Sequence, residues 1–186
     1  ISLALLLTLA ACQERSLQQE GHAREMKIAV LAPGVHTRVS AESFEANDRI
    51  GLFVTDYIEE ATPMPLQISG NRATNVAATF DGTAWNTAKT VYWGSGKSDV
   101  YAYYPYIENI SEIDNQFFAV SEDQDTQRSE AGLGGYEASD LLWAKAEGAS
   151  SAGGAVTLPM KHLMSKLTVR IVAGEDYIGS LPSDAS

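Results

Sequence analysis

Residues that could catalyse a reaction or hold a metal ion are few in this sequence. Its one cysteine, Cys12, excludes an intrachain disulfide, a four-thiolate zinc site and an iron–sulfur cluster. The histidines His22, His36 and His162 never lie three or four residues apart, the spacing that places two imidazoles on one face of a helix. We therefore expect no metal or cofactor site. We expect His162 to be structural, with a backbone group or a carboxylate as its partner.

Two short motifs are similar to binding loops but lack a residue that those loops require. Gly96-Lys97-Ser98 has Val91 at the position of the first glycine of a phosphate-binding loop. Asp123-Gln124-Asp125 begins like a calcium loop but has Arg128 in place of its glycine. No serine lies in a nucleophile motif, so the sequence predicts that the protein is not an enzyme.

Aromatic residues form a further group with possible binding chemistry. They are Trp85, Tyr92, Trp93, Tyr101, Tyr103, Tyr104 and Tyr106. If Trp85 and Trp93 were exposed, they would form a platform on which sugar rings stack. The other interpretation, which we favour, is the core and rim of a β-sandwich, because aromatic side chains are enriched in strands.

Charge and composition favour a folded protein that does not bind nucleic acid. The 186 residues include 13 Lys and Arg against 24 Asp and Glu, a formal net charge of −11. Affinity for a phosphate backbone requires the opposite balance. A hydrophobic content of 45% is enough to bury a core.

Short β-type segments separated by turn residues predict a mostly antiparallel all-β sandwich with little helix. The expected strands are Lys27–Leu31, Ile50–Tyr57, Leu66–Ile68, Val76–Phe80, Val91–Trp93, Val100–Tyr106, Phe117–Val120, Leu141–Ala144, Val156–Leu158 and Lys166–Val172. Asp81-Gly82 between apolar residues predicts a hairpin. Pro105 cannot donate to a ladder, so Val100–Tyr106 is expected to end at a sheet edge or to lie beside one.

A segment rich in Gly, Ala and Ser, Glu147–Gly154, has the composition of a linker and is the candidate domain boundary. We expect an N-terminal domain over 27–150. Because two strands cannot complete a sandwich, we expect 151–186 to be the truncated start of a second one.

The first residues have the character of an export signal. Residues 1–11 are apolar and uncharged, yet too short to span a bilayer. They end in Leu9-Ala10-Ala11-Cys12, which resembles the lipobox of bacterial lipoprotein signal peptides. That resemblance implies that residues 1–11 are removed and that Cys12 is lipidated, with 12–26 as a flexible tether. The alternative is a core helix with a buried free cysteine.

Five segments together resemble the fimbrillin-like lipoproteins of anaerobic gut and oral bacteria. They are residues 37–39, 44–53, 100–106, 139–144 and 158–167. The resemblance implies two transthyretin-like β-sandwich domains and a subunit of a cell-surface pilus, as stalk, anchor or tip. It implies an outer-membrane lipid anchor, other pilus subunits as partners, and host or bacterial surface ligands. In this family, trimming after an arginine removes the first strand, and a strand from the next subunit fills the groove.

Trimming of that kind would have to occur beyond the first predicted strand, Lys27–Leu31. Arg38 meets this condition, because Pro33 and Gly34 place it in a loop after the strand. Arg24 is the competing position, but a cut there would leave the strand in place. The alternative function is a monomeric surface lipoprotein that binds glycans through Trp85 and Trp93.

Lipidation of Cys12 gives the first testable prediction. Labelled palmitate should enter the wild-type chain and should not enter Cys12→Ala, because the thiol is the acylated group. Equal labelling of the two chains would contradict the prediction.

Overall fold

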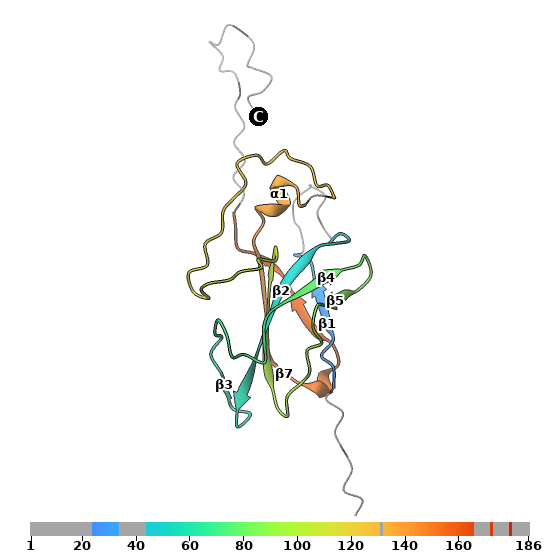
Figure 1. Cartoon of the computed structure of the whole chain (residues 1–186), viewed down its shortest axis with the longest axis vertical. Coiled ribbons are helices and arrows are strands. Elements are labelled where there is room, and N and C mark those ends of the chain that lie inside the picture. The colour runs from blue at the N-terminus through green and yellow to red at the C-terminus, as the bar shows by residue number, and fades with distance from the viewer. Residues whose placement is uncertain (1–23, 34–43, 131, 166–171, 173–178, 180–186) are drawn as a thin grey trace, which may run out of the picture.

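The protein has two β-sheets packed face to face (Figure 1). The computed structural model describes residues 24–33, 44–130, 132–165, 172 and 179. Several predictions fall outside these residues, namely the signal peptide 1–11, Cys12, Arg38, and all of the strand Lys166–Val172 except its last residue. Among the described residues, no helix has the length and apolar character needed to cross a membrane.

The larger sheet has seven strands, all paired antiparallel. Its order is β5 (Trp85–Thr87), β4 (Ala73–Phe80), β2 (Arg49–Ile58), β6 (Ser98–Tyr104), β7 (Leu142–Ala149) and β9 (Lys161–His162), with β3 (Thr62–Pro63) paired to the end of β2. The smaller sheet contains β1 (Ile28–Leu31) and β8 (Val156–Pro159), which run parallel and lie side by side in Figure 1. The helical elements in the described part are α1 (Gly135–Ala138) and the 3₁₀ turn η1 (Ser151–Gly153). The predicted all-β class is confirmed, and β1–β8 is its parallel exception.

Most predicted strands are present, but two lie in loops and a third forms only an isolated bridge. Leu66–Ile68 and Phe117–Val120 both lie in loops. Neither segment joins a ladder: Leu66 is half-buried against the larger sheet as a loop side chain, and Phe117 is 81% exposed. Residues 91–93 form only an isolated bridge, through Tyr92. The predicted hairpin at Asp81 is confirmed, because its Oδ1 accepts hydrogen bonds from the backbone of Thr83 and Ala84, both at 2.8 Å.

Both faces of the central strands β2 and β6 are buried. One face contributes the main core, with Leu52 and Val100 almost fully inaccessible. The other face contributes Phe53, Tyr101 and Tyr103, which are packed against loop residues between 105 and 113. The expectation that Val100–Tyr106 could lie beside a sheet edge is wrong, because β6 lies between β2 and β7. The strand does end before Pro105.

Strands β8 and β9 belong to this sandwich, although they lie in the segment expected to open a second domain. Val156, Leu158 and Met160 are buried in the same core as the strands of the larger sheet. Within the expected linker, the Gly148 amide donates a 2.9 Å hydrogen bond to the Asp99 carboxylate. Any second sandwich must therefore begin beyond His162, and its presence stays a prediction.

A buried ion pair fastens the long segment between β6 and α1 to the larger sheet. Asp48 is 3% exposed, and its carboxylate accepts hydrogen bonds from Arg128 at 2.8 Å and from the Tyr104 hydroxyl at 3.2 Å. Burial, followed by the Asp48 charge, raises the pKa of Tyr104. Breaking a buried pair by removing one partner is costly, so Arg128 holds this segment in place.

A close contact between β2 and β6 requires a glycine. Gly51 is paired with Tyr103, and a Cβ atom at position 51 would overlap the Tyr103 ring. That ring is fixed in place, because its hydroxyl donates to Asn75 Oδ1 at 2.6 Å. Desolvation by burial raises the pKa of Tyr103 to about 12.

We therefore predict that Gly51→Ala lowers the free energy of unfolding by about 1–3 kcal/mol, the usual cost of overpacking. Urea denaturation followed by circular dichroism measures the change. Gly153→Ala is the matched control, since a Cβ atom there meets no atom within 4 Å. Equal stability of the two variants would contradict the prediction.

Candidate functional site

The segment 24–31 pairs with two separate parts of the chain and defines the candidate site. Its first part pairs with residues 91–93, because the Met26 amide donates to the Val91 carbonyl at 2.8 Å and the Trp93 amide donates to the Arg24 carbonyl at 2.9 Å. Its second part is β1, which pairs with β8 from Ile28 opposite Val156 onward. Residues 24–26 were expected to end a flexible tether, but they are held in place by these pairings.

Alternate side chains of this segment close the core. Met26 is 5% exposed, and Ile28 and Val30 are half-buried against the same core cluster. This is the period of two that a strand with one buried face requires. The pattern begins at Met26, so the sequence carried a signal for this pairing that the predicted strand boundary at Lys27 missed.

The edges of β1 differ in their backbone pairing. Facing β8, the carbonyls of Lys27 and Leu31 accept hydrogen bonds from the amides of Val156 and Met160. The alternation along a strand therefore directs the backbone groups of Ile28 and Val30 toward the opposite edge. Arg24 and Met26 use that opposite edge to pair with residues 91–93, and the pairing stops before Ile28.

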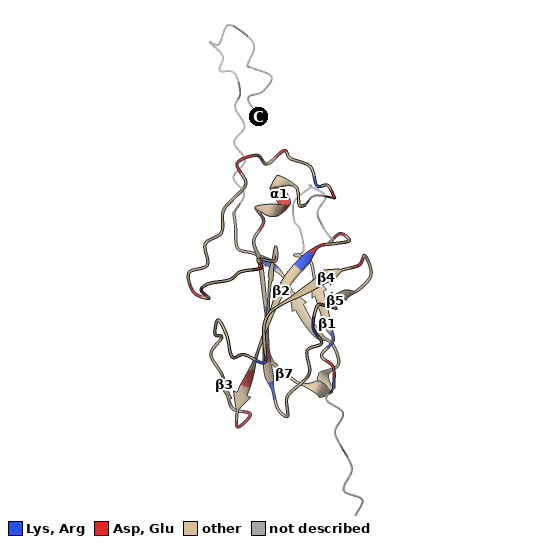
Figure 2. Cartoon of the chain, viewed as in Figure 1, with Lys and Arg blue, Asp and Glu red and all other residues tan. Residues whose placement is uncertain are grey.

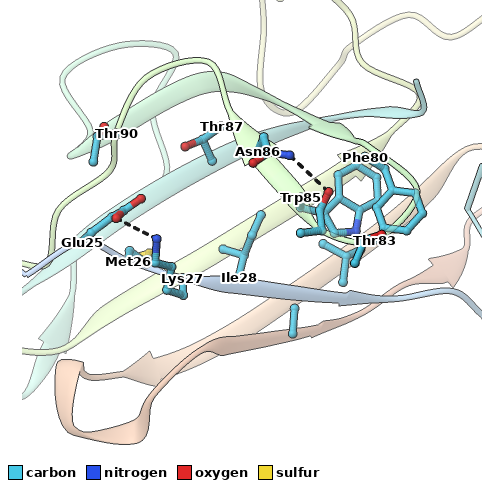
Figure 3. A pocket seen from close by; sticks show the side chains of 13 residues that line it. Glu25, Met26, Lys27, Ile28, Phe80, Thr83, Trp85, Asn86, Thr87 and Thr90 are labelled. Carbon is cyan, nitrogen blue, oxygen red and sulfur yellow. Dashed lines mark hydrogen bonds and ion pairs between the residues drawn. The ribbon is translucent and has the colours of Figure 1, made fainter. Parts of the chain in front are cut away.

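A cavity of about 610 Å³ opens where that pairing stops (Figure 3). It lies between β1 and β5 because the two ends of the segment 85–93 pair with different parts of the chain. Residues 85–87 pair with β4, whereas residues 91–93 pair with the segment before β1. The cavity is lined by Glu25–Val30, Phe80, Thr83–Thr87 and Thr90.

The aromatic residues separate into buried and accessible members. Trp93 is 7% exposed, and Tyr101, Tyr103 and Tyr104 are also buried, as the core interpretation predicts. Trp93 therefore has no ring face to offer to a sugar, which removes it from the expected glycan platform. Trp85 is half-buried and lines the cavity, with its ring centroid 5.0 Å from that of Phe44 and 5.2 Å from that of Phe80.

Charges near the cavity compensate each other. Lys27 Nζ lies 2.7 Å from Glu25 Oε2 at its rim, and both side chains are exposed. The Arg24 guanidinium donates to the Ser151 carbonyl, so this candidate cleavage residue is engaged with the turn before β8. Acidic residues are instead prominent in the loop beside α1 (Figure 2).

His162 lies at the other edge of the larger sheet, in β9. Its Nδ1 is 2.7 Å from Asp140 Oδ1, so the expected partner, a carboxylate, is confirmed. Across the described part of the chain, no three His, Cys, Asp or Glu side chains come together as a possible metal site.

Known proteins that are similar to this chain indicate its family. Two crystal structures of proposed cell adhesion proteins match this chain in part. One, from Bacteroides ovatus, is 19% identical with a TM-score of 0.53, over 75% of this chain and 52% of that chain. The other, from Bacteroides uniformis, is 22% identical with a TM-score of 0.48, over 74% of this chain and 47% of that chain. This chain thus spans about half the length of these solved structures.

No curated protein matches the chain. The family model described as fimbrillin-like matches residues 37–183, which include most of the sandwich described above. On the strength of that match, the chain belongs to the fimbrillin-like family.

Proposed function

We propose that this protein is a structural subunit of a cell-surface pilus, as stalk, anchor or tip, and that it assembles by strand exchange at β1. Membership of the fimbrillin-like family supports a surface protein of the pilus or adhesion type. The observation that carries the strand-exchange step is the position of β1. It closes the core with alternate side chains and is paired with a single neighbouring strand, β8.

Removal of β1 would open an apolar groove without cutting the larger sheet. Met26, Ile28 and Val30 would leave the core together. A fully buried apolar side chain contributes about 1.5–3 kcal/mol, a value that applies to Met26, whereas the half-buried Ile28 and Val30 contribute less. The β8 edge would lose its partner at the same time. A groove with an unpaired strand edge and an apolar floor is the acceptor that strand addition requires.

The chemistry of the donor strand follows from what β1 supplies. The donor must place an apolar side chain at every second residue, to replace Met26, Ile28 and Val30. It must also offer carbonyl groups to the amides of Val156 and Met160. A strand from a second subunit can meet both conditions with little dependence on its other side chains.

Anchoring is the second part of the proposal. A lipidated Cys12 would hold the subunit at the outer membrane, with other pilus subunits as partners. Acylation contributes about 0.8 kcal/mol per buried CH₂ group, and more than one acyl chain is needed for stable anchoring.

A disulfide that fixes β1 to β8 should block assembly. Ala29 and Thr157 are direct partners in the register. On β8, the residues on either side of Thr157, Val156 and Leu158, are buried in the core, so the Thr157 side chain points away from it. For the double variant Ala29→Cys/Thr157→Cys, we expect laddered oligomers in detergent gels only after the disulfide is reduced, because β1 cannot leave while the disulfide holds it to β8.

Each single-cysteine variant is the matched control and should polymerise with or without reductant. Full polymerisation of the oxidised double variant would contradict strand exchange at β1. Mass spectrometry of the peptide pair confirms that the disulfide has formed.

Trimming after Arg38 gives a separate prediction. N-terminal sequencing of the assembled surface form should begin at Val39, because only a cut beyond β1 releases the strand. Arg38→Ala should accumulate the untrimmed subunit and reduce polymer.

A start at Glu25 would instead favour cleavage after Arg24, which leaves β1 in place. A blocked and acylated Cys12 on the polymer would contradict trimming altogether.

A further inference from the structure

We infer that the cavity between β1 and β5 is a binding site for a short neutral oligosaccharide. Its volume of about 610 Å³ lies within the range of small-molecule sites. The site differs from the platform expected from the sequence, since it includes Trp85 without Trp93 and adds polar side chains from the segment just before β1 and from the β4–β5 hairpin. It also differs from the strand-exchange groove, because it requires β1 to be in place.

Polar groups and aromatic rings line the same cavity. The Trp85 indole N–H and the hydroxyls of Thr83, Thr87 and Thr90 make no hydrogen bond with another described residue. Figure 3 shows Trp85 and Thr87 on β5, Ile28 on β1 and Lys27 just before β1, around one cavity. A sugar ring offers hydroxyls that donate and accept around its rim and an apolar C–H face, so it complements both kinds of lining.

Backbone groups add further donors and acceptors. The Ala88 amide donates to the Ala77 carbonyl. Because only every second residue of an antiparallel strand bonds to a given neighbour, Asn86 is the next residue whose backbone bonds to β4. The N–H and C=O groups of Trp85 and Thr87 therefore point toward the free edge, as do those of Ile28 and Val30 on β1. Sugar hydroxyls can satisfy such groups from either side.

The charge at the cavity favours a neutral ligand. Glu25 and Lys27 are the charged residues of the lining, and they pair with each other at 2.7 Å. An anionic or cationic ligand would have to compete with this pair, whereas a neutral oligosaccharide can accept from Lys27 and donate to Glu25 without separating them.

The width of the gap argues against an extended peptide as the occupant. A strand bonded to both edges would need them about 9.5 Å apart, twice the usual spacing of strands. Cα atoms of β1 and β5 come within 8 Å of each other. Where the two strands are this close, an added strand could bond to both edges only if β1 moved, whereas a sugar needs no regular ladder.

The test uses the full untrimmed chain and isothermal titration calorimetry with cellotriose, maltotriose, mannotriose and chitotriose. At least one should bind. Trp85→Phe, which keeps a ring against Phe44 and Phe80 but removes the indole N–H, should weaken binding about tenfold, as should Thr87→Val. The controls Trp143→Phe, which alters the opposite face of the sheet, and Thr62→Val, in exposed β3, should bind like the wild type.

Circular dichroism and urea denaturation show whether each variant remains folded, and Thr87→Val keeps the test valid if Trp85→Phe unfolds. Three outcomes would overturn the inference: no binding of any trisaccharide up to millimolar concentration, equal binding by wild type and both cavity variants, or displacement of the sugar by an extended apolar peptide that binds more tightly. None of these outcomes bears on assembly by strand exchange, which is read from the oligomers of the locked double variant.

Discussion

The structure depends on the antiparallel pair β2–β6, because both faces of this pair are buried. Ile50, Leu52 and Val54 point to one side, while Phe53 and Tyr103 point to the other. A strand pair without a polar face must be covered on both of its faces. The small sheet β1–β8 provides one cover, and the segment after β6 provides the other.

The covers are attached by different physical means. Arg128 fastens the segment after β6 through a nearly inaccessible carboxylate, Asp48, and the Asn75 amide donates to the carbonyls of Ile107 and Glu108. β1 is attached by backbone pairing and apolar side chains alone. Such contacts depend on an alternating apolar pattern more than on an individual sequence, so β1 is the cover that we propose another strand replaces. This asymmetry is the physical basis of the proposed assembly.

The two proposals place different demands on the same segment. Strand exchange needs β1 to leave, whereas the cavity needs Lys27 and Ile28 as one of its walls. An oligosaccharide in the cavity would therefore contact β1 and β5 together and stabilise the closed subunit, by the linkage that applies to any ligand specific for one state. Ligand binding and assembly would therefore compete for this segment.

By itself, the sequence determined the all-β class, most strands and the hairpin at Asp81, because each depends on local periodicity or turn chemistry. For His162 the sequence predicted a backbone group or a carboxylate as partner, and the tertiary structure selected the carboxylate of Asp140. Tertiary structure decided the rest. Trp93 is buried and its neighbour Tyr92 is exposed because residues 91–93 pair with the segment before β1, a contact between distant parts of the chain. Glu147–Gly154 has the composition of a linker, yet Gly148 binds a buried carboxylate. The cavity exists because residues 85–87 and 91–93 pair with different segments. Pairing between segments far apart in the sequence leaves no signal in the local spacing of residue types.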